Sequence, residues 1–600
     1  MFRQLLVIAG LTLLSLSAIA EEPSTDTPVN GVSYIIQASS MDVARSAVVE
    51  AGGEITHELK IINAVGALLS PGQYNELASD TRLEIQRDRV AGISSTATLA
   101  PSTSLSREEP ASSAGGKGPI TYYGSLTRAS YLHKKGITGE GVTVAVVDTG
   151  YLDNASIEKN RGDTIRVLAK FDAIQNQSWK IDEKTIEENE IADEEDFAVG
   201  NDENGHGSHV MSVIANNKYD DNGNYLGVAP DANLVSVKAF DKFGNGTYLD
   251  VIRGLDWVLT NKTEYNIRVV NLSFSATPQS HYWDDPINEA VMQLWANDIF
   301  VVASAGNKGP DAMTIGVPGN VPYVMTVGAV TDNGTPNYTE DDALATFSSA
   351  GPTHEGFVKP DVVAPGGSIV GMMKNGDHQI TIDHPEFMFS YGDSTDYFTM
   401  SGTSQSAAIV SGIAALVLDA RPELTPDELK CLLVSSARPA TNSNGDLAVS
   451  VFQQGAGLVD AYNALVKRTT DCANVGLDII ADLAGTMHFG GRANKNTDGN
   501  YYLMGLDGYL WIDGYLWIDG YLWTDGHLWT DGYLWTDGYL WTDGSIGTNG
   551  YLWTDGYLWI DGYLWTDGYL WIDGYLWIDG YLWIDSTSET TSVNEWVNQE

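Results

Sequence analysis

Three short stretches of the sequence place reactive side chains at the ends of expected secondary-structure elements. Asp148 follows the apolar run Val142–Val147, which predicts a buried strand. Ser404 precedes the apolar run Ala407–Leu418, so its hydroxyl is expected at a helix N-terminus, where the helix dipole favours negative charge. His206 lies between small residues just before another helical stretch. Open α/β folds place their sites at the carboxyl ends of strands, and we therefore expect Asp148 to mark the functional edge of a sheet.

These three residue types form a set that can activate a serine hydroxyl. The hydroxyl is a poor nucleophile at neutral pH, so it needs an imidazole to take its proton and a carboxylate to hold that imidazole. The motifs are Val-Val-Asp148-Thr-Gly, Asn-Gly-His206-Gly-Ser-His and Gly-Thr-Ser404-Gln-Ser. Each motif alone is a common turn, loop or helix cap. Their joint occurrence in the order Asp, His, Ser matches the order found in subtilisins.

Residues 119–468 resemble the catalytic domain of subtilisin-like (subtilase, S8-type) serine proteases. Val301–Asn307 is similar to the strand and turn that present the oxyanion-hole asparagine of that family, which implies that Asn307 donates its amide to the developing oxyanion. The family usually has proline four residues after the nucleophile, where this chain has Ala408. The resemblance implies a three-layer α/β fold with a mainly parallel sheet, and an endopeptidase that cleaves proteins or peptides through an acyl-enzyme without a cofactor for the chemistry.

The same resemblance implies how a substrate peptide is held. Gly244–Tyr248 matches the strand that pairs with an extended peptide, which is β-augmentation, and Tyr248 would cover an outer subsite. Two further segments match the walls of the pocket for the cleaved position. These wall segments contain no acidic residue to meet Lys or Arg, so we expect a preference for apolar or aromatic residues. The implied substrate-binding residues are Gly246, Tyr248, Ser273, Phe274, Ser275, Ser304, Ala305 and Gly306.

Residues 1–20 predict a signal peptide. Arg3 supplies the positive start, Leu5–Leu16 the apolar stretch and Ala18–Ala20 the small-residue cleavage pattern. No other stretch approaches the roughly 18 apolar residues of a transmembrane segment. We expect a secreted protein in an oxidising compartment, in which Cys431 and Cys472 form a disulfide or remain two free buried thiols.

Residues 21–93 resemble the inhibitor-type propeptide of subtilases. The resemblance implies an intramolecular chaperone that also blocks the active site as an inhibitor before maturation. Residues 94–118 are rich in Ser, Ala, Pro, Gly and Thr and predict an exposed linker, where cleavage would release the mature enzyme. The pattern is a small α+β unit with strand-like runs at Val32–Gln37 and Ala64–Leu69 and helical stretches at Met41–Ala51 and Pro71–Ser79.

The chain is strongly acidic, with a formal net charge of -46. Because Lys and Arg are needed to neutralise phosphates, this charge excludes a general attraction to nucleic acid or anionic lipid. Ile181–Glu203 holds eleven acidic residues against the single base Lys184. We favour a solvated acidic surface loop ahead of the histidine over a cation site or a salt-adapted surface.

A structural Ca²⁺ ion is a possible ligand of a loop after the histidine helix. The interval between that helix and Gly227–Pro230 is where many subtilases carry a calcium loop. Short oxygen-bearing side chains around a glycine turn suit Ca²⁺, but such a string is equally an ordinary polar turn. The candidate ligands are Asp220, Asp221, Asn222 and Asn224.

Residues 508–585 repeat the hexapeptide Gly-Tyr-Leu-Trp-[Thr/Ile]-Asp, interrupted by one degenerate unit at Ser545–Gly550. A period of six equals one short strand plus one turn, which is compatible with a β-meander or with a β-solenoid of several units per coil. Rows of Trp and Tyr could bind a polysaccharide or a cell surface, Asp rows could bridge calcium, or the tail could be a self-packed spacer. No Lys or Arg follows Lys495, which argues against acidic polymers.

The predicted order of segments therefore ends with a connector at 469–507, the β-rich repeat domain at 508–585 and a polar C-terminal tail at 586–600. A competing interpretation of the whole chain is a secreted adhesive or structural protein whose subtilase-like domain acts only in self-processing.

Overall fold

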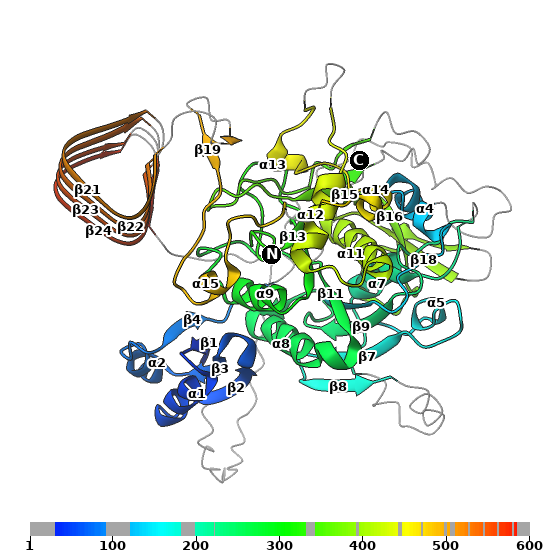
Figure 1. Ribbon diagram of the computed structural model, residues 1–600. Coiled ribbons are helices and arrows are strands. Elements are labelled where there is room, and N and C mark those ends of the chain that lie inside the picture. The colour runs from blue at the N-terminus through cyan, green and yellow to red at the C-terminus, as the bar shows by residue number, and fades with distance from the viewer. Residues whose placement is uncertain are drawn as a thin grey trace, which may run out of the picture.

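The computed structural model describes most of the chain and gives it three parts in sequence order. A small N-terminal unit is followed by a large α/β domain and then by a coil of parallel strands (Figure 1). The described residues are 31–91, 121–181, 199–220, 223–331, 342–391, 395–441, 447–469, 472–496, 501–503, 510–525, 528–543, 546–560, 563–578 and 581–584.

A nine-stranded sheet forms the centre of the α/β domain, with the order β14-β13-β12-β11-β6-β9-β7-β8 and with β15 also paired to β13. Its inner strands are parallel and only the edge strands β8 and β14 pair antiparallel, as predicted. The strands are β6 Thr143–Asp148, β7 Val167–Asp172, β8 Gln177–Lys180, β9 Asn233–Lys238, β11 Ile267–Leu272, β12 Phe300–Ser304, β13 Met325–Thr331, β14 Ala343–Leu344 and β15 Val362–Pro365.

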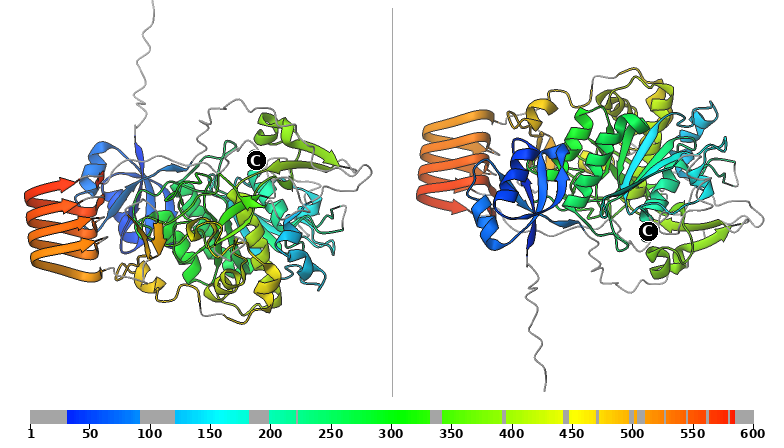
Figure 2. Two further views of the ribbon diagram at one scale, coloured as in Figure 1. Left: turned by 90° about the horizontal axis from the view of Figure 1, so that it is seen from above. Right: turned by 90° about the horizontal axis from the view of Figure 1, so that it is seen from below.

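Helices cover both faces of this sheet and give three layers (Figures 1 and 2). The helices α7 and α11 pack together on one face, and α8 and α9 pack on the other. The helices of the large domain and of the segment after it are α3 Tyr123–Leu126, α4 Ala129–His133, α5 Ala155–Glu158, α7 His206–Ala215, α8 Tyr248–Tyr265, α9 Pro286–Ala296, α10 Gln379–Asp383, α11 Thr403–Ala420, α12 Pro426–Ser436, α13 Val451–Gln454, α14 Ala461–Val466 and α15 Ile479–Leu483, with a 3-10 turn at Pro385–Phe387; the other 3-10 turn, Lys60–Ile62, lies in the N-terminal unit.

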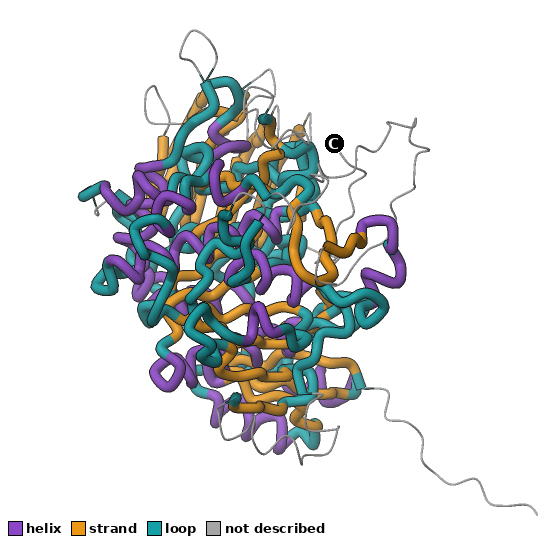
Figure 3. The backbone as a smooth tube through the Cα atoms, turned by 90° about the vertical axis from the view of Figure 1, so that its right-hand side faces the viewer, coloured by secondary structure: helices purple, strands orange, loops and turns teal. Residues whose placement is uncertain are grey.

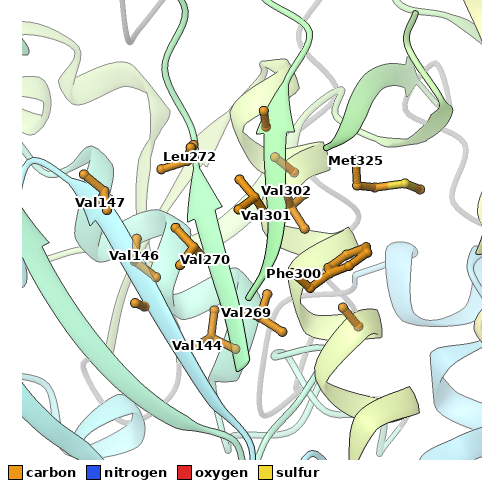
Figure 4. Packing of buried hydrophobic residues seen from close by; sticks show 14 of the residues in the cluster. Val144, Val146, Val147, Val269, Val270, Leu272, Phe300, Val301, Val302 and Met325 are labelled. Carbon is orange, nitrogen blue, oxygen red and sulfur yellow. The ribbon is translucent and has the colours of Figure 1, made fainter. Parts of the chain in front are cut away.

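Continuous apolar strands explain why this sheet is buried on both faces. Val144 and Val146 on β6 lie beside Val269 and Val270 on β11, and Val302 on β12 extends the row (Figure 4). All five side chains are at most 1% exposed. A strand that is apolar at every position can be stable only between two covering layers.

The helix α11 is the most buried helix around the site. Among the described residues it is the one helix long and apolar enough to cross a membrane, but 89% of that window is buried inside the domain. It contacts β11, β12, β13 and β15, so its hydropathy reflects a core position. Ala408, which stands where the family usually has proline, is fully buried and the helix is continuous there.

The N-terminal unit is a four-stranded antiparallel sheet with two helices, as predicted from the alternating pattern. Its strand order is β2-β3-β1-β4, and the helices α1 and α2 begin at serine caps, Ser40 and Ser70. Its last two residues form β5, which pairs with β10 of the large domain. The elements are β1 Val32–Gln37, α1 Met41–Glu50, β2 Glu54–Leu59, β3 Ala64–Leu69, α2 Pro71–Leu77, β4 Glu84–Arg87, β5 Val90–Ala91 and β10 Gly246–Thr247.

Two smaller strand groups flank the large domain. The strands β16 Ile369–Met372, β17 Met388–Tyr391 and β18 Thr395–Met400 form an antiparallel sheet just before α11. Figure 3 shows the whole backbone from the side, with helices and loops around the strands. The strands β19 Ala493–Lys495 and β20 Tyr501–Leu503 pair beyond α15.

The segment expected to be a connector packs closely on the α/β domain. Cys472 forms a disulfide with Cys431 on α12, with Cα atoms 5.2 Å apart, which is the first of the two predicted alternatives. The buried carboxylate of Asp482 accepts hydrogen bonds from the hydroxyls of Tyr282 at 2.6 Å and Tyr323 at 2.9 Å. This part of the chain is therefore integrated into the domain.

The hexapeptide repeats form a parallel coil in which corresponding positions of the repeat are in register. Leu510 pairs with Leu528 and Trp511 with Trp529, an offset of 18 residues, or three hexapeptides for each coil. This pairing is that of a β-solenoid and not of a meander. The strands are β21 Leu510–Asp525, β22 Leu528–Asp543, β23 Ile546–Ile560, β24 Tyr563–Ile578 and β25 Tyr581–Ile584.

The docking of the connector can be tested through Asp482. Replacing it by alanine leaves two buried tyrosine hydroxyls without their acceptor, at a cost of about 1–3 kcal/mol for each unsatisfied group. We expect Asp482→Ala to lower the Tm of the protein by several degrees, measured by differential scanning calorimetry, while Glu423→Ala at an exposed position leaves it unchanged. Equal Tm values for the two variants would contradict the docking.

Candidate active site

Asp148 and His206 meet at the carboxyl edge of the sheet. Asp148 is the last residue of β6 and His206 the first residue of α7, and Asp148 Oδ1 lies 2.7 Å from His206 Nδ1. Both residues are 1% exposed. A carboxylate on Nδ1 holds the ring proton there, which leaves Nε2 as the basic nitrogen.

Asp202 holds the loop that carries the histidine, a role that the sequence did not reveal. Its Oδ1 accepts hydrogen bonds from the N–H groups of Asn204 and Gly205 at 3.1 and 2.7 Å, and its Oδ2 accepts from the N–H of Ser208 at 2.8 Å. It thus caps the first turn of α7. The hydroxyl of Thr149, the residue after Asp148, also donates to Asp202 Oδ1 at 2.8 Å.

This corrects part of the prediction for the acidic stretch Ile181–Glu203. Asp202 is 1% exposed and does not belong to a solvated surface, and Glu203 pairs with Lys238. The signal that could have found it is an aspartate placed four residues before a helix-initiating histidine. The rest of the acidic run, residues 182–198, lies outside the described residues.

Ser404 lies in the first turn of α11, as predicted from the apolar run that follows it. It is 3% exposed, and its Oγ donates a hydrogen bond to the carbonyl oxygen of Ser273 at 3.0 Å. The hydroxyl of Ser273 donates in return to the carbonyl oxygen of Ser404 at 3.0 Å. Because β6 and β11 are parallel neighbours with Leu272 beside Val147, Asp148 and the Ser273 carbonyl oxygen that Ser404 contacts lie at the same edge of the sheet.

Asn307 faces the same helix N-terminus with its amide orientation fixed. Its Oδ1 accepts from the N–H of Thr403 at 3.0 Å and from the Thr403 hydroxyl at 2.9 Å. Its oxygen is therefore engaged and its Nδ2 remains as a donor beside the nucleophile turn, 3.4 Å from where a Cβ on Gly402 would lie. Such a donor at a helix N-terminus suits a developing oxyanion.

The two predicted pocket walls are neighbours in the sheet. Phe274 and Ser275 follow β11, and Ala305 and Gly306 follow β12, which pairs with it in parallel. The hydroxyl of Ser304 donates to the carbonyl oxygen of Phe274 at 2.9 Å and ties the walls together. All of these residues are buried.

A third wall segment, Gly316–Pro318, was not predicted. The N–H of Gly316 donates to the carbonyl oxygen of Ala305 at 3.2 Å, and Val317 exchanges two backbone hydrogen bonds with Ala276. A Cβ on Gly316 would lie 1.9 Å from Ser275 Oγ, so only glycine fits there. The signal for it was the Gly-Val-Pro-Gly turn after the second wall.

The predicted peptide-pairing strand is occupied by the N-terminal unit. Gly246 and Thr247 pair antiparallel with Ala91 and Val90. Tyr248, which we expected in this strand, instead begins α8 because Thr247 caps the helix through Asp250 N–H. The Tyr248 ring is 1% exposed and lies under the Arg89 guanidinium at 4.3 Å.

The described part of the candidate calcium loop closes on itself. Asp220 Oδ1 accepts from the N–H of Asn224 at 2.7 Å, and Asp220 Oδ2 accepts from the Asn224 amide at 3.2 Å. This is the geometry of a polar turn. Asp221 and Asn222 lie outside the described residues, and among the residues described no three His, Cys, Asp or Glu side chains are grouped as a metal site. Calcium binding stays a prediction.

The profile of the Subtilase family (Peptidase_S8) matches residues 139–457, which is more than half of the chain and includes Asp148, His206, Asn307 and Ser404. The chain belongs to the subtilase family. This chain is therefore a serine endopeptidase of the subtilase type, with the α/β fold described above.

Two curated relatives and one solved structure support this assignment. The serine protease AprX of Bacillus subtilis is 37% identical over 334 residues, which cover 55% of this chain and 67% of AprX. Subtilisin E of Bacillus subtilis is 27% identical over 456 residues, covering 75% of this chain and 93% of that protein. The crystal structure of fervidolysin from Fervidobacterium pennivorans has a TM-score of 0.51 at 20% identity, covering 74% of this subtilase and 62% of that chain, and it shares the fold.

Proposed function

We propose that this subtilase is a secreted endopeptidase in which Ser404 is the nucleophile and His206 the general base. His206 Nε2 takes the hydroxyl proton as Ser404 Oγ attacks the peptide carbonyl, and the resulting imidazolium gives that proton to the leaving amine. Asp148 orients the ring and stabilises its charged form. Water then attacks the acyl-enzyme by the same proton transfers, releasing the acid and restoring the serine. The buried 2.7 Å contact between Asp148 and His206 carries this proposal.

Asn307 and the N–H of Ser404 are the proposed oxyanion donors. The two hydrogen bonds from Thr403 to Asn307 Oδ1 support this role, because they leave only the amide hydrogens to face the nucleophile turn. A donor fixed before the reaction costs no reorganisation when charge develops.

The substrate is proposed to be an extended polypeptide with an apolar or aromatic residue at the cleaved position. Antiparallel pairing of Val90 and Ala91 with β10 supports this, because it is a peptide bound in the expected mode. The pocket walls at 273–275 and 304–306 contain no charged residue, which favours an apolar side chain.

The N-terminal unit is proposed to act as an inhibitor-type propeptide. Its end reaches β10, and its body is held on α8 and α9 by polar contacts. Asp256 Oδ1 accepts from the N–H of Ile61 at 2.8 Å, and Arg89 pairs with Asp285 at 3.1 Å. Ile62 and neighbouring apolar residues of the unit belong to the same buried cluster as the large domain. A unit held in this way keeps substrate from β10 until it is cleaved off.

Export, the repeat coil and calcium complete the proposal. The disulfide Cys431–Cys472 supports an oxidising, extracellular location. The parallel strands β21 to β25 place corresponding positions of the repeat in rows along the backbone, a regular spacing suited to a repeating polymer or a cell surface. Calcium at the Asp220 loop is proposed only as structural.

The alternative, an adhesive protein that only processes itself, predicts no cleavage of added peptides.

Self-processing predicts the behaviour of Ser404→Ala. This variant removes the nucleophile, so the bond after the N-terminal unit stays intact and the unprocessed precursor accumulates. The measurement is the mass and N-terminal sequence of the protein made in a protease-deficient host. Normal maturation of Ser404→Ala would show that another protease cuts the bond.

The oxyanion role predicts the kinetics of Asn307→Leu. Leucine has nearly the same shape but no donor, so the chemical step should slow by about 10²–10³-fold with KM little changed. The test is steady-state hydrolysis of a peptide amide for which acylation limits the rate. A kcat equal to that of the wild type would remove Asn307 from the oxyanion hole.

Docking of the N-terminal unit predicts a pH-dependent precursor. Burial, together with the nearby charges of Glu84 and Asp284, raises the pKa of Glu289 to about 7 from its usual 4.5, although the hydrogen bond from Gln37 at 2.7 Å acts in the opposite direction. The docked state then binds more protons than the free state, so the stability of the Ser404→Ala precursor should fall as the pH rises from about 4.5 to 7.

Glu289→Gln keeps the shape and removes the titration. In the Ser404→Ala background it should flatten the fall in Tm between pH 4.5 and 7, measured by calorimetry, and should give the higher Tm at pH 8. The same slope in both proteins would show that Glu289 does not link docking to protons.

The accessory role of the repeats predicts the effect of deleting residues 508–600. Every proposed catalytic group lies before residue 405, so turnover of a soluble peptide should be unchanged. Retention on an insoluble polymer or on cells, measured by sedimentation, should be lost. A parallel fall in peptide turnover would indicate that the coil supports the catalytic domain.

A further inference from the structure

The segment just before the nucleophile lies against the loop that carries His206. We call residues Met373–Met400 the pre-nucleophile segment; it contains α10 and the hairpin β17–β18. Its last residue is followed directly by Ser401–Ser404 at the start of α11. One covalent segment therefore contacts the loop of the general base and leads into the nucleophile.

Three consecutive donors of this segment bind three consecutive carbonyl oxygens of the histidine loop. The first donor is the side chain of His378, and the other two are backbone N–H groups. The pairs are His378 Nδ1 with Asp202 O at 2.8 Å, Gln379 N with Glu203 O at 2.7 Å, and Ile380 N with Asn204 O at 3.1 Å.

His378 is packed directly beneath the residue before the base. It is 1% exposed, and a Cβ added to Gly205 would lie 2.9 Å from His378 Cβ and 2.3 Å from Met373 Cε. Because a carbonyl oxygen can only accept, His378 Nδ1 must carry a proton in this contact. The side chain thus combines tight packing with one directed hydrogen bond.

The carbonyl that His378 holds belongs to the residue that orders the histidine loop. The carboxylate of Asp202 binds the first turn of α7, as described above. The same helix is held further along by His209, whose Nε2 lies 3.2 Å from the carbonyl oxygens of Ile369 and Phe398. Burial and the nearby His206 lower the pKa of His209 to about 3, so this second contact is made by a neutral ring.

We propose that His378 is a positioning residue for the peptidase reaction. Its Nδ1–H fixes Asp202, and through Asp202 it sets the His206 imidazole against Asp148 and the nucleophile. This inference rests on the proposed roles of His206 and Ser404. His378 lies outside the pocket walls at 273–275, 304–306 and 316–318, so it acts on the chemical step and not on substrate binding.

A matched pair of variants separates the hydrogen bond from the packing. His378→Leu fills similar space without a donor, whereas His378→Asn places an amide N–H where Nδ1 lies. Misplacing a base by a fraction of an ångström to 1 Å costs up to about 10²-fold, so we expect kcat of His378→Leu to fall by about tenfold or more with KM unchanged, and His378→Asn to recover most of it. His384→Asn, on the same segment but partly exposed, is the control.

The pH profile gives a readout that a purely structural role would not move. An imidazole displaced from Asp148 loses the carboxylate that stabilises its charged form, so the acidic limb of kcat/KM should move to lower pH in His378→Leu and return in His378→Asn. The proposal would be overturned if kcat and the acidic limb of kcat/KM were unchanged in His378→Leu. It would also be overturned if His378→Leu and His378→Asn had equal kcat and equal acidic limbs.

Two further arms keep the test decisive. If His378→Leu does not fold, His378→Asn is compared with His378→Gln, whose amide N–H lies nearer the Nε2 position; equal kcat for these two overturns the proposal. Titration of wild-type Ser404 with a fluorophosphonate separates a failure of the proposed function from a failure of the positioning role of His378. A wild type that does not react there refutes the proposed function itself, whereas normal titration with indifferent His378 variants refutes only the positioning role.

Discussion

The buried hydrogen bond between Asp148 and His206 joins the two layers on which the site depends. It connects the end of β6 to the start of α7. This arrangement is unfavourable for the second carboxylate oxygen, because Asp148 Oδ2 is buried without a hydrogen-bond partner among the described residues. Because a buried polar atom without a partner is unfavourable, the contact of Asp148 Oδ1 with His206 has to be kept, and Asp202 contributes to this by ordering the loop that carries the histidine.

The strand proposed to bind substrate, Gly246–Thr247, pairs with Val90 and Ala91 of the N-terminal unit. Carboxyl groups on α8 and α9 hold that unit through its N–H and guanidinium groups, as Asp256 holds Ile61 and Asp285 holds Arg89. The acidity of the chain therefore has a local use at this interface. Burial raises the pKa of Asp256 by more than its hydrogen bond from the N–H of Ile61 lowers it.

Local pattern was sufficient to predict the elements whose stability is local. Periodicity and caps gave β1, α1 and α11 to within a few residues, and motif order gave the four residues at the sheet edge. Asp202 and Gly316 carried local signals, the position four residues before His206 and the Gly-Val-Pro-Gly turn, but their contacts with Thr149 and Ser275 join distant segments and could not be inferred from those signals. The helical position of Tyr248 follows from the Thr247 cap, which the match to a peptide-pairing strand did not take into account. The repeats left two folds open because a period of six fits either; only the pairing of Leu510 with Leu528 separates them.

The central claim is that Ser404 is activated by His206 at this junction. The most direct measurement is peptide mapping by mass spectrometry after the mature protein reacts with a fluorophosphonate at neutral pH. The account predicts one adduct, on Ser404, and its loss in His206→Ala, because the serine hydroxyl is a poor nucleophile without its base. Adducts on another residue, or equal labelling of Ser404 in His206→Ala, would contradict it.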